Sequence, residues 1–141
     1  MRHADSKGFG WIRTSTPTLP LSDKGNPMPD HLLFLSQSGI TPEISRPSPE
    51  TVIAGDPVFS TWSVEDKDGL CCGIWRCTPG KWRIAYAEWE YCRIVSGLSV
   101  LTEDGGAARI VRAGDSFIIR PGFKGTWDVM ETTVKDYVIR L

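Results

Sequence analysis

The chain has 141 residues, a length that fits one domain and leaves little room for two. Hydrophobic residues make up 40% and charged residues 23%, and no apolar run approaches the roughly 18 residues of a membrane helix. Sixteen basic residues oppose seventeen acidic ones, so the net charge of -1 does not suggest nucleic acid as a partner. Four cysteines and no recognisable secretory leader predict a cytoplasmic protein with free thiols.

The first part of the sequence differs in composition from the rest. Between positions 8 and 29, thirteen of twenty-two residues are Gly, Pro, Ser, Thr or Asn, which bury too little apolar surface to offset their ordering entropy. We therefore predict that residues 1–29 are a flexible leader or a spurious one, with translation starting at Met28. The alternative is an arm that packs on a partner subunit through Phe9, Trp11 and Ile12.

Residues 30–50 read as an N-terminal arm followed by a connector. The apolar run Leu32–Leu35 is too short to distinguish a strand from a helical turn. The next segment holds three prolines within eight residues, and proline removes backbone donors, so this part is expected along a sheet edge or at the surface. These prolines are Pro42, Pro47 and Pro49.

From residue 51 onward the pattern is that of an all-β domain. Short runs of β-branched and aromatic residues alternate with Gly, Pro and Asp turn signals, and no helical apolar spacing persists. A lone flat sheet would expose one face and two edges, so residues 51–141 are expected to form a sandwich or barrel. The expected strands are 57–64, 70–77, 81–86, 89–96, 98–102, 107–112, 116–120, 125–131 and 133–140.

Short motifs in this region resemble a known family. They are Gly73 and Trp75, Pro79 and Gly80, Glu90 with Cys92 and Gly97, Gly114 and Asp115, Gly122, Trp127 and Lys135. Together they resemble the cupin superfamily, and more narrowly the small cupins grouped with (S)-ureidoglycine aminohydrolase and the ethanolamine-utilisation cupin. The resemblance implies a single-domain, RmlC-like jelly-roll barrel with a small pocket in its mouth, and by analogy a homodimer.

The same resemblance defines where a metal would be bound. A metal-binding cupin supplies two histidines and a glutamate from its first motif and a third histidine from its second. Here only the glutamate position is kept, by Glu90, and the two histidines of the chain, His3 and His31, lie outside the barrel segment. One carboxylate does not hold a transition metal tightly, so we predict no metal and no cofactor. The histidine positions fall on Ile84 and Tyr86, or on Arg83 and Ala85 in a shifted alignment, and on Gly125.

Strand alternation and the resemblance together give a set of candidate site residues. The candidate catalytic residues are Glu90, as a general base or an anchor for a cationic ligand, Cys92, as a nucleophile if a cation lowers its pKa, and Lys135. Each has a structural alternative, because a buried cysteine often only fills space and a strand lysine often lies at a solvated edge. The candidate ligand-binding residues are Trp127, Tyr86, Trp75, Arg83 and Glu88.

These residues predict a metal-independent cupin that binds a small polar metabolite inside its barrel. The family resemblance points to nitrogen compounds, and a proton-transfer or isomerisation step with Glu90 as base is one interpretation. A non-catalytic binding or interaction module is the alternative, so whether the protein is an enzyme is left open. A weaker alternative is a zinc-dependent enzyme with cysteine ligands taken from Cys71, Cys72, Cys77 and Cys92.

Overall fold

The computed structural model describes residues 31–141, so the expected leader at 1–29 and both interpretations of it lie outside the described residues. The run Leu32–Leu35 belongs to no regular element, neither strand nor helical turn, and its side chains are exposed. The proline-rich connector does run along a sheet edge, because Glu43–Ser45 within it pairs with the strand that begins at Phe59.

The described chain is built of nine strands and one 3-10 turn, and none of its helical segments has the length or hydropathy to cross a bilayer. The strands are β1 (Glu43–Ser45), β2 (Val52–Gly55), β3 (Phe59–Lys67), β4 (Leu70–Cys77), β5 (Gly80–Ala85), β6 (Trp89–Glu103), β7 (Ala108–Arg112), β8 (Ser116–Ile119) and β9 (Lys124–Arg140), and the turn is Pro49–Thr51.

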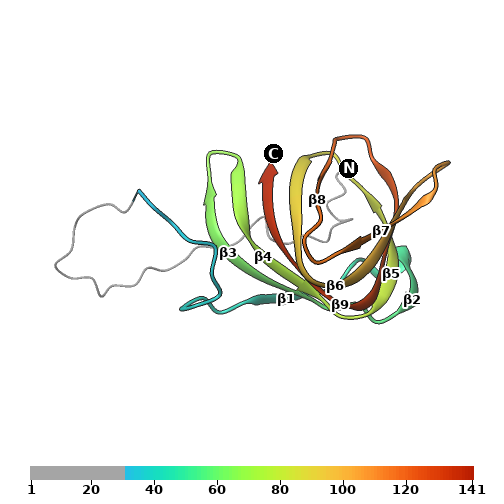
Figure 1. Ribbon diagram of the computed structural model, residues 1–141, viewed down its shortest axis with the longest axis horizontal. Helices are drawn as coiled ribbons and strands as arrows, with labels where there is room; N and C mark the ends of the chain where they lie inside the picture. Colours follow the sequence, from blue (N-terminus) through green and yellow to red (C-terminus); the bar gives the residue numbers. More distant parts are fainter. Residues whose placement is uncertain (1–30) are drawn as a thin grey trace.

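The strands form one sheet that curls into two facing layers (Figure 1). The long strands β6 and β9 run through both layers. In one layer the order is β1-β3-β4-β9-β6-β8, with the C-terminal half of β9 and the N-terminal half of β6. In the other it is β2-β5-β9-β6-β7, with the opposite halves of the two long strands. This confirms the predicted all-β class and is consistent with a cupin jelly roll.

The separate strands expected at 89–96 and 98–102 are in fact one strand with a bend at Gly97. The pairing of β6 with β9 shifts register between Ile94 and Ser99, and the buried positions change from even to odd numbers there. Gly97 has a φ of +97°, and a side chain at this position would collide with the carbonyl oxygen of Thr132 on β9. The glycine therefore bends the strand instead of ending it, as β-bulges do.

The expected strands 125–131 and 133–140 likewise merge into β9. Alternate residues of β9 point inward on both sides of the bend, from Trp127 and Val129 in one layer to Tyr137 and Ile139 in the other. At the bend itself Thr133 is buried and its hydroxyl lies 2.7 Å from that of Ser99. This hydrogen bond joins the two long strands where both of them change layer.

We expect Gly97→Ala to lower the free energy of unfolding by more than the roughly 1–3 kcal/mol that a left-handed backbone costs a residue other than glycine, because it adds a collision with β9. The matched control is Gly105→Ala, where φ is +83° and open space surrounds the new methyl group. Denaturant unfolding of both variants measures the difference. If both variants lose the same free energy of unfolding, the close approach of β9 to Gly97 is not what requires a glycine there.

Candidate functional site

An ion pair is buried at the centre of the barrel. Glu90 on β6 and Lys135 on β9 both occupy inward positions, with 1% and 4% of their surface exposed. The Lys135 Nζ lies 2.8 Å from the Glu90 Oε2, close enough for a charge-assisted hydrogen bond. Two opposite charges held this far from water must be paired, because either one alone would cost several kcal/mol to bury.

The second oxygen of Glu90 also has a partner. The Tyr86 hydroxyl donates to the Glu90 Oε1 at 2.6 Å. Tyr86 directly follows β5, and its backbone is held by hydrogen bonds with Gly122 and Phe123. Burial, and then the negative charge of Glu90, raise the pKa of Tyr86 well above its usual value, so the hydroxyl keeps its proton and remains a donor.

The Lys135 ammonium lies between two indole rings. Its Nζ is 4.5 Å from the ring centroid of Trp75 and 4.6 Å from that of Trp127, within the range of cation–π attraction. Trp75 reaches it because its Cα is the direct cross-strand partner of Lys135. Burial alone would lower the pKa of Lys135, but the negative charge of Glu90 and the hydrogen bonds of the ammonium to Glu90 and to the Cys92 sulfur outweigh burial and raise it. Lys135 is therefore a permanent cation.

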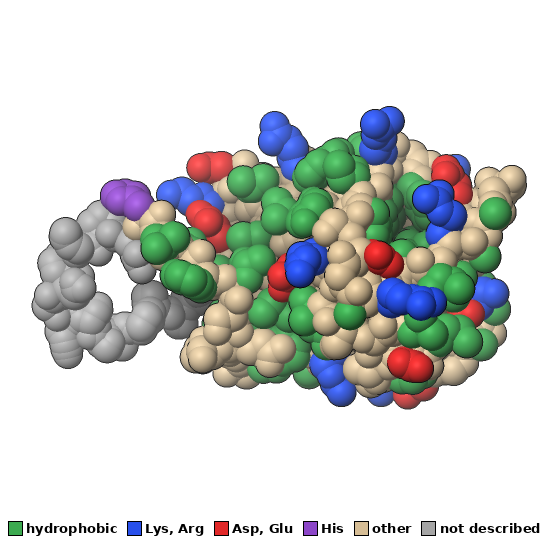
Figure 2. Space-filling view, in the orientation of Figure 1, with side chains coloured by type: hydrophobic (Ala, Val, Ile, Leu, Met, Phe, Trp, Pro, Cys, Tyr) green, Lys and Arg blue, Asp and Glu red, His purple; other side chains and the backbone are tan. Residues whose placement is uncertain are grey.

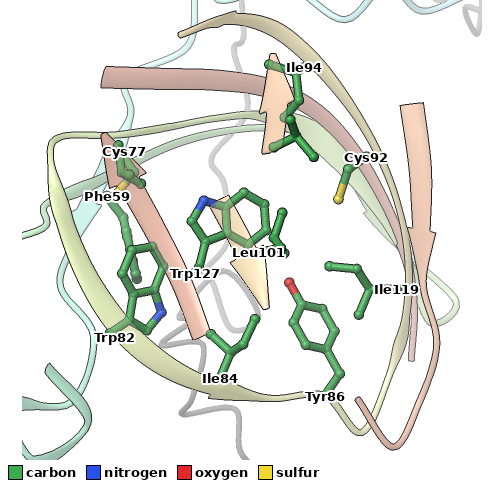
Figure 3. Close-up of a cluster of buried hydrophobic side chains, with 12 residues drawn as sticks. Phe59, Cys77, Trp82, Ile84, Tyr86, Cys92, Ile94, Leu101, Ile119 and Trp127 are labelled. Atoms are coloured by element: carbon green, nitrogen blue, oxygen red, sulfur yellow. The ribbon is translucent and has the colours of Figure 1, made fainter. Parts of the chain in front are cut away.

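Cys92 lies beside the same ammonium but stays protonated. Its Sγ is 3.7 Å from the Lys135 Nζ, and its side chain points into the barrel (Figure 3). Burial and the charge of Glu90 raise the pKa of Cys92 well above its usual value, and they outweigh the lowering effect of Lys135. A reactive cysteine needs a lowered pKa, so this environment favours a neutral thiol that fills space and accepts a weak hydrogen bond.

A cavity of about 30 Å³ adjoins the ion pair, enough for about one water molecule or a few ligand atoms. The indole rings of Trp82 and Trp127 stack at 6.3 Å on its lining (Figure 3). Their Nε1 groups are buried, and neither donates to any residue in the range 31–141. The other lining residues are Phe59, Thr61, Trp75, Ile84, Tyr86, Glu90, Lys135, Tyr137 and Ile139.

Six residues line the cavity without being among the candidate site residues, namely Phe59, Thr61, Trp82, Ile84, Tyr137 and Ile139. Tyr137 has the parity of Lys135, so the alternation of β9 could have identified it. The β3 residues gave no such signal, because β3 lies outside both cupin motifs and only its pairing with β4 brings it to the interior.

Two of the expected ligand-binding residues, Arg83 and Glu88, lie away from the cavity. Trp82, Ile84 and Tyr86 point inward, so the alternation of β5 turns Arg83 outward, where its guanidinium forms a half-exposed ion pair with Asp104 at 2.8 Å. Glu88 lies in the turn before β6, where its Oε1 accepts a hydrogen bond from the backbone N–H of Ala87. Neither residue lines the cavity.

The interior does not fit the metal of a metal-binding cupin. Glu90 keeps the ligand position, but an ammonium lies 2.8 Å from it, where a metal ion would have to approach. A side chain at Gly125 would collide with the backbone of Thr102, so the position of the third histidine has no room for an imidazole. Within residues 31–141, no three His, Cys, Asp or Glu side chains gather to hold an ion. The zinc alternative does not fit either, since this range includes all four cysteines.

The fold and the sequence identify the family. The profile of the EutQ-like cupin domain matches residues 64–137, just over half of the chain. The protein belongs to this family of cupins. No curated protein matches the sequence.

Solved structures show the same fold at low identity. A protein of unknown function of the DUF861 family from Pseudomonas syringae pv. tomato is 23% identical, with a TM-score of 0.67 over 74% of this chain and 46% of that one. The Clostridium difficile EutQ protein is 18% identical, with a TM-score of 0.54 and coverages of 60% and 68%. Ectoine synthase from P. lautus is 14% identical, with a TM-score of 0.54 and coverages of 58% and 63%. The chain thus spans less than half the length of the Pseudomonas protein.

Removing one partner of the buried pair is expected to destabilise the fold strongly. We expect Glu90→Gln and Lys135→Met each to cost about 3–5 kcal/mol in free energy of unfolding, because each leaves a buried charge unpaired. The double variant should cost clearly less than the sum of the single ones.

Denaturant unfolding of the native protein, the two single variants and the double variant gives the coupling energy between Glu90 and Lys135. The control is Arg83→Met, which breaks the half-exposed pair with Asp104 and should cost less than about 1 kcal/mol. Additive effects of Glu90→Gln and Lys135→Met would contradict the ion pair as described.

Proposed function

We propose that the protein binds a small polar ligand at the barrel interior, with the Lys135 ammonium serving in place of a metal ion. The buried ion pair of Lys135 and Glu90, which lies beside a cavity, is the main support for this proposal. Well-packed apolar residues are often more stable than a buried ion pair, so stability alone gives little reason to keep these charges inside the barrel. Perturbed ionisable groups beside a cavity are typical of functional sites.

The cavity favours a ligand that inserts a hydrogen-bond acceptor. Lys135 offers a positive charge, and the indole N–H groups of Trp82 and Trp127 are donors without a partner in the described chain. About 30 Å³ admits a carbonyl or carboxylate group but not a whole metabolite. Amide, ureido and carboxylate compounds carry such a group. The likeness of the motifs to those of the ureidoglycine aminohydrolase group supports ureido compounds as the first to test.

The same cluster is suited to moving a proton. Glu90 can accept a proton from a carbon or nitrogen atom of the ligand and return it to another atom of the same molecule. No proton is gained or lost overall, so the product is an isomer of the ligand. The Lys135 ammonium would stabilise the negative charge that develops on the ligand oxygen in between. In this scheme Tyr86 positions the carboxylate through its hydrogen bond and does not react.

A non-catalytic interaction module is the second candidate. The small cavity volume favours it, and so does the complete pairing of the Glu90 carboxylate by Tyr86 and Lys135. In this case the charges only fix the arrangement of the two layers, and no small molecule enters the barrel.

A thermal-shift screen separates the two candidates. Ureido compounds, amino acids, sugar acids and amines are the probes, and we expect compounds with a carbonyl or carboxylate group to raise the melting temperature because they bind only the folded state. Thr61→Val, which changes one lining hydroxyl and leaves the ion pair intact, should reduce the shift, and Glu90→Gln should abolish it.

Arg83→Gln is the control and should leave the shift unchanged, because Arg83 lies outside the cavity. If none of the four compound classes shifts the melting temperature of the native protein, the binding proposal is wrong and the interaction module stands. If Thr61→Val and Glu90→Gln both show the same ligand-induced shift as the native protein, the ligand does not bind in the cavity.

A further inference from the structure

A second and larger hollow lies at the open side of the barrel. It is a groove of about 870 Å³ between β7, the edge of one layer, and β8 with the loop that follows it, at the edge of the other. In Figure 2, basic side chains lie among apolar ones on the half of the molecule that carries these strands. The groove shares no lining residue with the inner cavity.

Charged side chains line this groove, and all of them are exposed. On β7, Arg109 has the parity of the buried Val111, and on β6, Glu103 has that of the buried Leu101. Arg120 directly follows the buried Ile119 at the end of β8. Among residues 31–141, none of these three side chains forms an ion pair, so both guanidinium groups are accessible to a ligand.

The floor of the groove is aromatic and separates it from the inner cavity. Phe123 meets Tyr86 edge to face at 6.2 Å between ring centroids, and Phe117 lies 6.4 Å from Trp127. Phe117 and Phe123 line the groove, and Tyr86 and Trp127 line the cavity. The groove is therefore a separate site with an apolar floor and two arginines along its walls.

We propose that this groove binds a carboxylate ligand with an apolar body. Arg109 and Arg120 supply guanidinium groups, which hold carboxylates through paired hydrogen bonds. The aromatic floor accepts the apolar body, and the volume lies in the range of small-molecule sites. The other acidic lining residue, Asp115, already accepts a hydrogen bond from the backbone N–H of Arg112, so Glu103 is the one carboxylate that competes for the arginines. This site goes beyond the proposed function and does not depend on it.

The test compares two probes with the same apolar body and opposite charge. Calorimetric titration with 3-phenylpropionate and with phenethylamine should show binding of the acid and binding at least about 10-fold weaker for the amine. A double variant that carries both Arg109→Gln and Arg120→Gln should bind the acid about 10-fold more weakly or worse, because it loses the charged hydrogen bonds to the carboxylate. Arg112→Gln is the matched control, because Arg112 lies on the same strand and does not line the groove.

The outcomes separate this site from the inner cavity. Thr61→Val should leave binding of 3-phenylpropionate unchanged, since Thr61 lines only the cavity and the change leaves the ion pair intact. Loss of binding in Thr61→Val, equal binding of the amine, or no effect of the double arginine variant would each overturn the proposal. The proposal would also be wrong if the protein bound neither probe and formed a dimer that is lost in the double arginine variant. The groove would then be an interface between copies of this chain.

Discussion

The interior of this barrel depends on one ion pair. Lys135 and Glu90 neutralise each other away from water, Tyr86 satisfies the remaining carboxylate oxygen, and two indole faces surround the ammonium. Each of these contacts compensates part of the cost of burying charge, and none of them compensates it alone. The result is a fixed positive charge at the centre of a cupin barrel, provided by a side chain on β9.

The two long strands explain why this pair can form at all. Glu90 lies on the N-terminal half of β6 and Lys135 on the C-terminal half of β9, which pair directly within one layer. Trp127 reaches the ammonium from the other half of β9, which has crossed into the facing layer. The bend at Gly97 lets β6 follow that crossing, and the Ser99–Thr133 hydrogen bond joins the two strands there. The same bend brings the edges β7 and β8 to opposite sides of the groove.

Much of this arrangement could be predicted from the sequence. Alternation grouped Glu90 with Cys92 on one face of a strand, and the family resemblance selected this face and that of Trp127 as interior. The motifs predicted the fold, whereas Lys135 was left between the pocket and a solvated edge. Alternation is local, however, and could not show that Lys135 pairs with Glu90, because that contact depends on a register between residues 45 positions apart. For the same reason it could not predict that burial would keep Cys92 protonated beside a cation. The homodimer and the cytoplasmic location stay predictions.

Nuclear magnetic resonance of the Lys135 side-chain nitrogen can show whether this residue is charged inside the barrel. We expect an Nζ signal of a charged ammonium that exchanges slowly with solvent and keeps its protons above pH 10.5, the ordinary pKa of lysine, because Glu90 stabilises the positive form. A neutral amine at pH 8, or a signal that titrates below the ordinary pKa, would show that Lys135 is not a buried cation.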